Sequence, residues 1–320
     1  MWEQCPEVNR KIKQVKTIIS ENLKSRSKPL EDLLLDLSIN GGKMLRPALT
    51  IIAAGLGKAW DDKILDAAAG IEVLHMATLV HDDIIDDAGM RRGKPTINQV
   101  HGDKMAVFMG DYLLTRAVML LSKTLPKERI ESIAKGIKSV CEAEIEQFYS
   151  RFNLEISLTS YLKRISKKTA VLFAFSCSEG AFLSNCKKEH IRGLSKLGYY
   201  YGMAFQIQDD ILNLTEDAKN TGKPEGNDIK EGVITLPFIL ALRKSQEFKE
   251  NVRSIFSSGN MSQEDIRRII EQIEHLGGIN DAYSWIERYL EKLQDLLDLL
   301  PDKQAKEIMD ETIRHSIKSR

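Results

Sequence analysis

The sequence predicts an all-α fold, a bundle of long helices around a central cavity. Glycine (20 residues) and proline (8 residues) are scarce among the 320 residues, which favours long regular elements over many turns. Apolar residues recur at spacings of three and four, as in Leu30, Leu33 and Leu34, and no strand-like alternation competes with this period. Several predicted helices are apolar on nearly all faces, which is typical of central helices wrapped by others.

Each helix is predicted from its own apolar period and from its end signals. A capping box begins at Ser262, and Pro301 fits the first turn of the last helix. The stretches that are apolar nearly all round are 60–86, 157–183 and 187–214. In chain order the predicted helices are 7–25, 28–39, 43–57, 60–86, 103–122, 127–150, 157–183, 187–214, 234–244, 246–256, 262–277, 279–299 and 302–318.

Two polar segments, 87–100 and 215–232, have no regular period, and each directly follows a pair of aspartates. A loop after a buried acidic helix end is a natural substrate lid, so both are predicted to be irregular lids. No linker, low-complexity tract or change of composition divides the chain. We therefore expect one domain over residues 1–320.

Composition limits the partners and the compartment. The 46 lysines and arginines balance the 46 aspartates and glutamates, so net charge gives no general argument for a nucleic-acid partner, and none is expected. There is no signal-peptide pattern and no run of about 18 apolar residues, so no membrane span is predicted. A cytoplasmic protein with reduced thiols is expected, because no CxxC pair or zinc spacing occurs among Cys5, Cys141, Cys177 and Cys186.

A first pair of aspartates, Asp82 and Asp83, lies in an otherwise apolar helical run with Asp86. Buried carboxylates are costly unless something pairs with them. Asp82 and Asp86 are four residues apart on one helix face, a spacing that can hold Mg²⁺ beside a phosphate group. Arg91 and Arg92 follow as candidate bidentate diphosphate ligands. The alternatives are a solvated acidic helix end and plain salt bridges to the arginines.

A second cluster contains Asp209, Asp210 and Asn213, with Asp209 and Asn213 again one turn apart. Lys223 follows in a Thr-Gly-Lys turn, and Asp228 lies beyond it. Two acidic faces around a cavity, with metal ions between them and basic residues at the rim, would chelate a diphosphate from both sides.

Basic and imidazole side chains form further candidates. Lys43 and Arg46 lie at i and i+3 at a predicted helix start, which favours anions, although a charged surface helix explains them equally. Lys168 lies in a largely apolar stretch and needs a charged partner if it is buried. Glu72 and His75 have the ExxH spacing of a di-iron bundle, but no second ExxH occurs. A lone histidine there is otherwise a hydrogen-bonded core residue.

Ala77 and Thr78 lie five and four residues before Asp82, one turn deeper on nearly the same face. A substrate tail bound at the aspartates would run past them. An aromatic side chain there would close the pocket early, whereas small residues leave it open for a long tail. Small residues for helix packing are the alternative explanation.

Taken in order, the motifs resemble those of the trans-prenyltransferases (all-trans polyprenyl diphosphate synthases) over nearly the whole chain. The matching segments are 41–47, 79–87, 91–93, 110–113, 168–170, 205–212 and 222–224. The stretches 75–83 and 141–147 are similar to the catalytic component II of bacterial heptaprenyl diphosphate synthases. The resemblance implies the isoprenoid synthase fold. It also implies a homodimer, or a heterodimer with a small non-catalytic subunit, with helices around 103–150 at the interface.

The same resemblance implies roles for individual residues. Asp82 and Asp86 bind two Mg²⁺ ions and Asp209 a third, with Asp83 and Asp210 completing the two catalytic motifs. Asn213 stands where the second motif usually ends in Asp, which puts its direct role in doubt. The residues that hold the allylic diphosphate are Arg91, Lys168, Thr169, Gln206 and Lys223. The residues that hold isopentenyl diphosphate are Lys43, Arg46, His75 and Arg92.

The implied activity is Mg²⁺-dependent head-to-tail condensation of isopentenyl diphosphate with an allylic diphosphate, farnesyl or geranylgeranyl. The expected product is a medium or long chain such as hexa- or heptaprenyl diphosphate for quinone side chains, as in menaquinone, with peripheral membrane contact for product release. Two alternatives stay open: a catalytic subunit inactive without a small partner, and a terpene cyclase of the same fold. The isopentenyl site of Lys43, Arg46 and Arg92 argues against a cyclase, which has no second diphosphate to hold.

Overall fold

The computed structural model describes residues 5–28, 30–31, 33–34, 42–91, 93–215, 226–300 and 303–318. The predictions for Arg92, Lys223 and Pro301, and most of the helix expected at 28–39, concern residues outside these ranges. So does most of the lid predicted over 215–232, whose described part contains a short helix (Asn227–Lys230) and is therefore not wholly irregular.

The described chain is a helical bundle with one small hairpin, in agreement with the predicted all-α class. The hairpin pairs β1 (Met90–Arg91) with β2 (Lys94–Pro95) in antiparallel register. The helices are α1 (Pro6–Asn22), α3 (Leu45–Ala54), α4 (Lys63–Ile85), α5 (Ile97–His101), α6 (Asp103–Thr124), α7 (Lys127–Tyr149), α8 (Leu158–Ile165), α9 (Val171–Leu183), α10 (Lys188–Thr215), α12 (Asn227–Lys230), α13 (Leu236–Leu242), α14 (Gln246–Ser257), α15 (Gln263–His275), α16 (Gly278–Asp298) and α17 (Lys303–Lys318).

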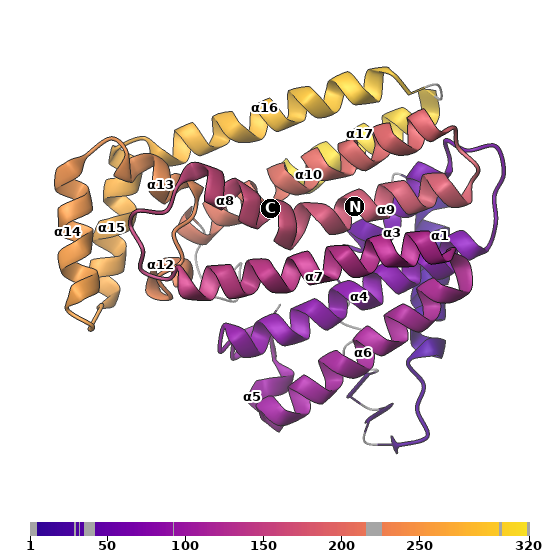
Figure 1. The fold of residues 1–320 in the computed structure, drawn as a ribbon, viewed down its shortest axis with the longest axis horizontal. Coiled ribbons are helices and arrows are strands. Elements are labelled where there is room, and N and C mark those ends of the chain that lie inside the picture. The colour runs from indigo at the N-terminus through magenta and orange to yellow at the C-terminus, as the bar shows by residue number, and fades with distance from the viewer. Residues whose placement is uncertain are drawn as a thin grey trace.

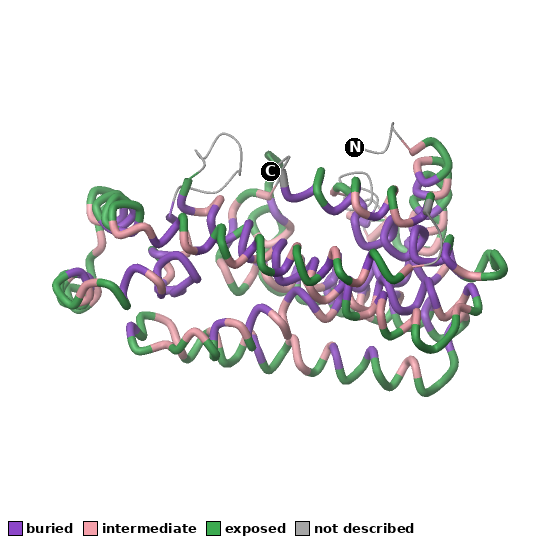
Figure 2. Tube along the Cα trace, turned by 90° about the horizontal axis from the view of Figure 1, so that it is seen from above, coloured by how far each residue is buried: buried purple, intermediate pink, exposed green. Residues whose placement is uncertain are grey.

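The long helices lie side by side, and the shorter helices α12 to α15 gather at one end of the molecule (Figure 1). Helix α4 packs against α6 and α3, and α10 packs against α9 and α16. Buried residues concentrate in the middle of the bundle and exposed residues follow its outer helices (Figure 2). The stretches predicted to be central, which became α4, α9 and α10, supply much of this core.

Two glycines of α10 allow close contact with the backbone of α9 and of Ala170 just before it. A Cβ atom at Gly198 would lie 2.4 Å from the carbonyl oxygen of Phe173, and one at Gly202 would lie 2.5 Å from Cα of Ala170. Only residues without a side chain fit these backbone contacts. The two helices are therefore held together just below the second aspartate cluster.

The segment predicted as one helix over 157–183 is continuous but not uniform. Helix α8 passes into a π-helical turn (Ser166–Ala170) before α9 begins. A π turn contains an extra residue, so it rotates the side chains that follow relative to those that precede it. Single-sequence periodicity does not reveal such a local change of pitch.

The segment 87–100 was predicted to be irregular, and this is wrong for part of it. It contains the hairpin and the start of α5. Gly93, at φ 75°, supplies a left-handed residue in the hairpin turn. The Thr96 side chain accepts a hydrogen bond from the Gln99 backbone and so caps α5. Two-residue strands are too short to show an alternating pattern.

Two helices, α4 and α6, reach the length and apolar content of a membrane span. For α4, 72% of the apolar window is buried inside the protein, which identifies it as the core helix of the bundle. For α6 the buried share is 39%, so much of its apolar surface faces outward. Exposed apolar area of this kind is typical of an interaction surface.

Candidate active site

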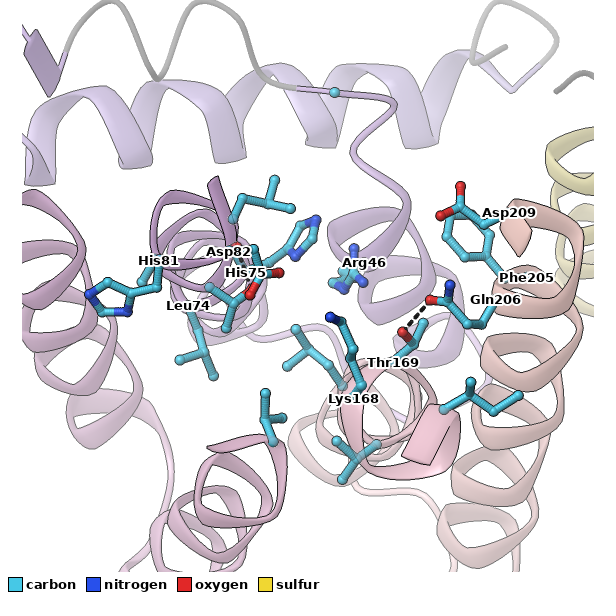
Figure 3. A pocket seen from close by; sticks show the side chains of 18 of the residues that line it. Arg46, Leu74, His75, His81, Asp82, Lys168, Thr169, Phe205, Gln206 and Asp209 are labelled. Atoms are coloured by element: carbon cyan, nitrogen blue, oxygen red, sulfur yellow. Dashed lines mark hydrogen bonds between the residues drawn. The ribbon is translucent and has the colours of Figure 1, made fainter. Parts of the chain in front are cut away.

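A cavity of about 1210 Å³ opens between α3, α4, α7, α9 and α10. Asp82 and Asp209 lie on opposite sides of it, with Arg46 and Lys168 between them (Figure 3). The structure therefore brings the two aspartate clusters together across one opening, as predicted. The predicted site residues that line this cavity are Lys43, Arg46, His75, Ala77, Thr78, Asp82, Asp86, Arg91, Lys168, Thr169, Gln206, Asp209, Asp210 and Asn213.

Asp82 and Asp86 lie at the C-terminal end of α4, where the helix dipole is also negative. Burial raises the pKa of Asp82 to about 7; among nearby charges, Lys168 lowers it while Glu144 and Asp86 raise it further. Such a cluster of carboxylates is stabilised by a cation.

The donor set fits a metal that the substrate helps to hold. Within the described residues, no group of three or more His, Cys, Asp or Glu side chains is placed to bind a metal by itself. Asp82 and Asp86 come from α4 and Asp209 from α10. Mg²⁺ is characteristically held by one or two carboxylates together with substrate phosphates and water, which is what this divided arrangement offers.

Asp83 does not share the position of its neighbour Asp82. It is buried, and its Oδ1 accepts a hydrogen bond of 2.6 Å from Nε of Arg91 in β1. Asn98 donates to the Asp83 backbone carbonyl at 3.3 Å. Asp83 thus fastens the hairpin to the end of α4, and Arg91, a predicted diphosphate ligand, is oriented by a carboxylate.

Lys168 has the charged partner that its apolar surroundings required. Its Nζ lies 2.7 Å from Oε1 of Glu144 on α7. Burial alone would lower the pKa of Lys168, but Asp82 and Glu144 outweigh this and raise it. Glu144 was missed as a site residue, although it lies in the stretch 141–147 that resembles component II. Its neighbour Glu146 makes the parallel pair with Lys167 at 3.0 Å.

In the second cluster Asp209 is exposed toward the cavity mouth and Asp210 is buried. Asp210 accepts hydrogen bonds from Tyr161 Oη at 2.5 Å and from Gln206 Nε2 at 2.9 Å. Asn213 Oδ1 accepts from the backbone N–H of Asp228 at 3.3 Å. The amide oxygen of Asn213 is therefore used to anchor the start of α12.

The segment before α3 presents basic groups to the same cavity. Met44 adopts a left-handed conformation, with φ 52°, and α3 begins directly after it. Arg46 is buried, and its guanidinium lies 4.3 Å from the centroid of the Phe173 ring. Such stacking positions the guanidinium at the cavity wall, and an arginine side chain stays charged there. Lys43 and His75 also line the cavity.

Below the charged mouth the cavity becomes apolar. Ala77 of α4 is buried, and the hydroxyl of Thr78 donates to the His75 carbonyl at 2.8 Å, so Thr78 adds no unsatisfied donor to the wall. Opposite them, a Cβ atom at Gly136 would lie 2.4 Å from the Phe175 ring, which therefore packs directly on the α7 backbone. The apolar lining residues of this part are Leu74, Ala77, Ile133, Gly136, Ile137, Val140, Leu172 and Phe175.

Comparison with known proteins agrees with this geometry. The family model described as polyprenyl synthetase matches residues 27–273. The chain belongs to the polyprenyl synthetase family. It is 36% identical to heptaprenyl diphosphate synthase component 2 of Bacillus subtilis (strain 168), over 93% of this chain and 85% of that protein. The protein is therefore a prenyltransferase, as predicted.

Two solved structures of the family share the whole fold. Heptaprenyl diphosphate synthase from Staphylococcus aureus is 35% identical, with a TM-score of 0.94 over 98% of each chain. Polyprenyl synthase from Caulobacter crescentus CB15, complexed with calcium and isoprenyl diphosphate, is 30% identical, with a TM-score of 0.93 over 98% of this chain and 96% of that one. The expected isoprenoid synthase fold and the resemblance to component II are thus confirmed.

Proposed function

We propose that this polyprenyl synthetase condenses isopentenyl diphosphate with farnesyl or geranylgeranyl diphosphate and makes a medium- or long-chain product such as hexa- or heptaprenyl diphosphate. The observation that carries the proposal is a single cavity whose mouth is lined by two sets of carboxylates and by cations, and whose depth is apolar. Such a cavity holds two diphosphates at one end and a hydrocarbon tail at the other.

The allylic diphosphate is assigned to the opening between α4 and α10. Asp82, Asp86 and Asp209 would hold it through Mg²⁺, for which we propose three ions. When bound, these ions neutralise the diphosphate as a leaving group. Lys168 and Arg91 supply direct cationic contacts, with Glu144 and Asp83 holding them in place. Lys223, outside the described residues, keeps its predicted role in the same group.

The reaction moves three electron pairs and one proton. The allylic C–O bond breaks, and its electron pair leaves with diphosphate. The alkene electrons of isopentenyl diphosphate then form the new carbon–carbon bond from C4 to the allylic carbon. A proton lost from C2 goes to the released diphosphate and restores a double bond. Thr169, Gln206 and Phe205 line the cavity where the cationic carbon needs weakly nucleophilic surroundings.

Isopentenyl diphosphate is assigned to the side of the cavity formed by the start of α3 and by α4. Lys43, Arg46 and His75 line it, and Arg92, outside the described residues, is the fourth predicted ligand. A second diphosphate site has no use in a terpene cyclase, so this group favours a synthase.

Product length is argued from the depth of the apolar part. On α7 the lining residues extend from Ile133 to Gln147, a span of 14 residues or about 21 Å at the helical rise. Ala77 and Thr78 do not obstruct this path, which favours a long tail over an early stop. A product of this length suits a quinone side chain, including that of menaquinone.

A subunit interface is proposed on α6 and α7. Their exposed apolar residues form a surface that a second chain would cover. A heterodimer with a small non-catalytic subunit is consistent with the name component 2 of the Bacillus subtilis relative, and a homodimer is the alternative. The cytoplasmic location and peripheral membrane contact stay predictions. The exposed apolar residues are Met105, Val107, Phe108, Val118, Met119, Ile145, Phe148 and Tyr149.

The test is an incorporation assay. The purified chain is incubated with Mg²⁺, farnesyl diphosphate and labelled isopentenyl diphosphate, and the dephosphorylated products are sized. Products of six or seven isoprene units support the proposal. Products that stop at four units would overturn the long-chain assignment. No incorporation would overturn the stand-alone synthase, and cyclic hydrocarbon formed without isopentenyl diphosphate would identify a cyclase.

A further inference from the structure

A chain of hydrogen bonds leads from the cavity wall into the protein interior. Thr169 Oγ1 donates to Gln206 Oε1 at 2.6 Å, as the dashed line in Figure 3 marks. Gln206 Nε2 donates to Asp210 Oδ1 at 2.9 Å, and Tyr161 Oη donates to Asp210 Oδ2 at 2.5 Å. Tyr161 is completely buried and is not among the residues that line the cavity.

The chemistry of these groups fixes the direction of every bond in the chain. An ionised carboxylate can only accept hydrogen bonds, so Asp210 accepts one from the Tyr161 hydroxyl and one from the Gln206 amide nitrogen. With its nitrogen committed to Asp210, Gln206 presents its oxygen to Thr169. The Thr169 proton is then used in this bond, and the remaining lone pairs of Thr169 are left for the cavity.

The hydrogen-bonded residues come from two backbone segments, the one that runs from α8 through the π turn and helix α10, and both segments are shaped to bring them together. Eight residues of a regular α-helix would place Tyr161 and Thr169 about 80° apart around the axis. The π turn between them adds about one residue, which brings both side chains to nearly the same face, toward α10. Gly202 lets α10 approach at this level, and Gln206 and Asp210 follow on one face of α10.

The orientation matters for the proposed reaction. Oxygen lone pairs are the negative ends of the Thr169 and Gln206 dipoles, and a developing allylic cation is stabilised by such fixed dipoles. If the Gln206 amide turned over, Thr169 would accept instead of donate, and its proton would point the positive end of the hydroxyl dipole at the cation. Tyr161, which donates to Asp210, therefore affects the reacting carbon indirectly. Asp210 orients Gln206, and Gln206 orients the Thr169 hydroxyl that faces the cavity.

We propose that Tyr161 is a positioning residue for ionisation of the allylic substrate, acting through Asp210 and Gln206 to fix the direction of the Thr169 hydroxyl. The proposal rests on the function assigned above. It names a residue outside the cavity whose hydroxyl group contributes to the rate of carbon–oxygen cleavage and not to substrate affinity.

The test compares two buried tyrosines that differ in this one respect. Y161F removes the hydroxyl that donates to Asp210. Y201F removes an equally buried hydroxyl, paired with Ser316 Oγ at 2.7 Å, that does not line the cavity. Both variants lose a buried hydrogen bond, and both are expected to melt at a slightly lower temperature. Only Y161F is expected to slow single-turnover ionisation of farnesyl diphosphate, by about tenfold, with unchanged KM.

A double variant separates positioning from a general structural effect. If Tyr161 acts through Thr169, the double variant T169V/Y161F should be no slower than T169V alone. In T169V the hydrogen-bond chain from Tyr161 no longer reaches the cavity, so loss of the Tyr161 hydroxyl has no further effect on the rate. D210N, which allows the Gln206 amide to turn over, is expected to lower the single-turnover rate at least as much as Y161F. It provides the readout if Y161F does not fold.

Equal rates for Y161F and wild type, equal slowing in Y161F and Y201F, or full additivity of T169V with Y161F would each overturn the proposal. Diphosphate release is measured from farnesyl diphosphate with Mg²⁺ alone, so it does not depend on isopentenyl diphosphate. A wild-type protein that releases diphosphate but incorporates no isopentenyl diphosphate contradicts the proposed function, while the comparison of Y161F with Y201F still decides the role of Tyr161.

Discussion

Asp82 and Asp83 are neighbours in sequence, yet they face different surroundings. Asp82 lines the cavity, whereas Asp83 is buried against Arg91. The second pair divides in the same way, with Asp209 exposed and Asp210 bonded to Tyr161. Successive residues of an α-helix point about 100° apart, so one aspartate of each pair can serve the substrate while the other holds the structure around it.

A first prediction concerns Asp82 in the metal-free protein. Its pKa is raised from 3.8 to about 7, chiefly by burial, so the folded chain holds this proton more tightly than the unfolded chain. Stability therefore falls as pH rises from about 4 through about 7. D82N removes the free-energy cost of burying an ionised carboxylate. It should therefore raise the melting temperature above that of wild type at about pH 8, with little difference at about pH 4.

The comparison uses thermal unfolding in the presence of a chelator. D209N is the matched control, because Asp209 is exposed, and it should leave the melting temperature near that of wild type at both pH values. A D82N effect of the same size at both pH values would contradict the prediction.

A second prediction concerns product length. A77F places a ring in the path of the tail one turn below Asp82, so the main product should shorten by at least one isoprene unit. A77S, which keeps the volume small, is the control and should leave the distribution unchanged. Chromatographic sizing of the dephosphorylated products gives the answer, and an unaltered length for A77F would show that the tail does not pass this residue.

At the scale of elements, the hairpin and the π turn decide how Arg91, Lys168 and Thr169 are presented to the cavity. The Asp83–Arg91 pair fastens the hairpin to α4, and the Thr96 hydroxyl donates to the carbonyl of Ala88, just after α4, at 2.6 Å. The π turn sets the directions of Lys167, Lys168 and Thr169. Lys167 pairs with Glu146 and Lys168 with Glu144, so α7 holds both lysines.

A third prediction follows from the hairpin. D83N removes the charge that orients Arg91, so KM for the allylic substrate should rise by about tenfold, an effect near that of one charge-assisted hydrogen bond. The turnover number should change less, because Asp82 and Asp86, the proposed magnesium ligands, are intact. Steady-state kinetics with varied farnesyl diphosphate measure both quantities.

D87N is the control for this experiment. Asp87 lies in the same motif but is exposed, and its left-handed conformation, with φ 44°, is one that asparagine adopts readily. It should behave as wild type. An unchanged KM in D83N, or an equal rise in D87N, would show that Arg91 does not depend on Asp83.

At the scale of the whole molecule, the exposed apolar residues of α6 and α7 form the proposed subunit interface. Phe108 is 68% exposed near the start of α6. F108E should convert a proposed dimer to a monomer, because a buried charge at an interface without a partner is strongly unfavourable. Light scattering after size-exclusion chromatography gives the mass.

L299E is the matched control. Leu299 is 76% exposed at the end of α16, away from α6 and α7, and its replacement should leave the mass unchanged. A monomeric wild type would contradict the homodimer and favour a separate small subunit, which co-purification with such a subunit would then test.

The helical elements were predictable because the amphipathic or apolar period of each helix is visible within its own stretch of sequence. The predicted range 103–122 corresponds to α6, and 187–214 corresponds to α10, within a few residues. The capping box at Ser262 is present, with Asp265 as its second member. The short hairpin, α5 and the π turn were not predicted, because their signals span too few residues to form a period.

The candidate site was predictable to the extent that its residues lie in compact motifs. Asp82, Asp86 and Lys168 line the cavity as expected. Glu144 and Tyr161 were not identified, since their roles depend on contacts with residues 24 and 49 positions away. Nothing in their own neighbourhoods distinguishes them from other residues of a helix face.

The sequence by itself determined the helical class, the order of the motifs and the family, because all three depend on residue types at short, regular spacings. Only the tertiary structure decided which groups meet: Glu144 with Lys168, Arg91 with Asp83, and Tyr161 with Asp210. These pairings depend on how closely the helices approach and on how a π turn rotates them. Contacts between segments far apart in the sequence arise only when the bundle packs, and the apolar period of one helix does not show which other residues its side chains will meet.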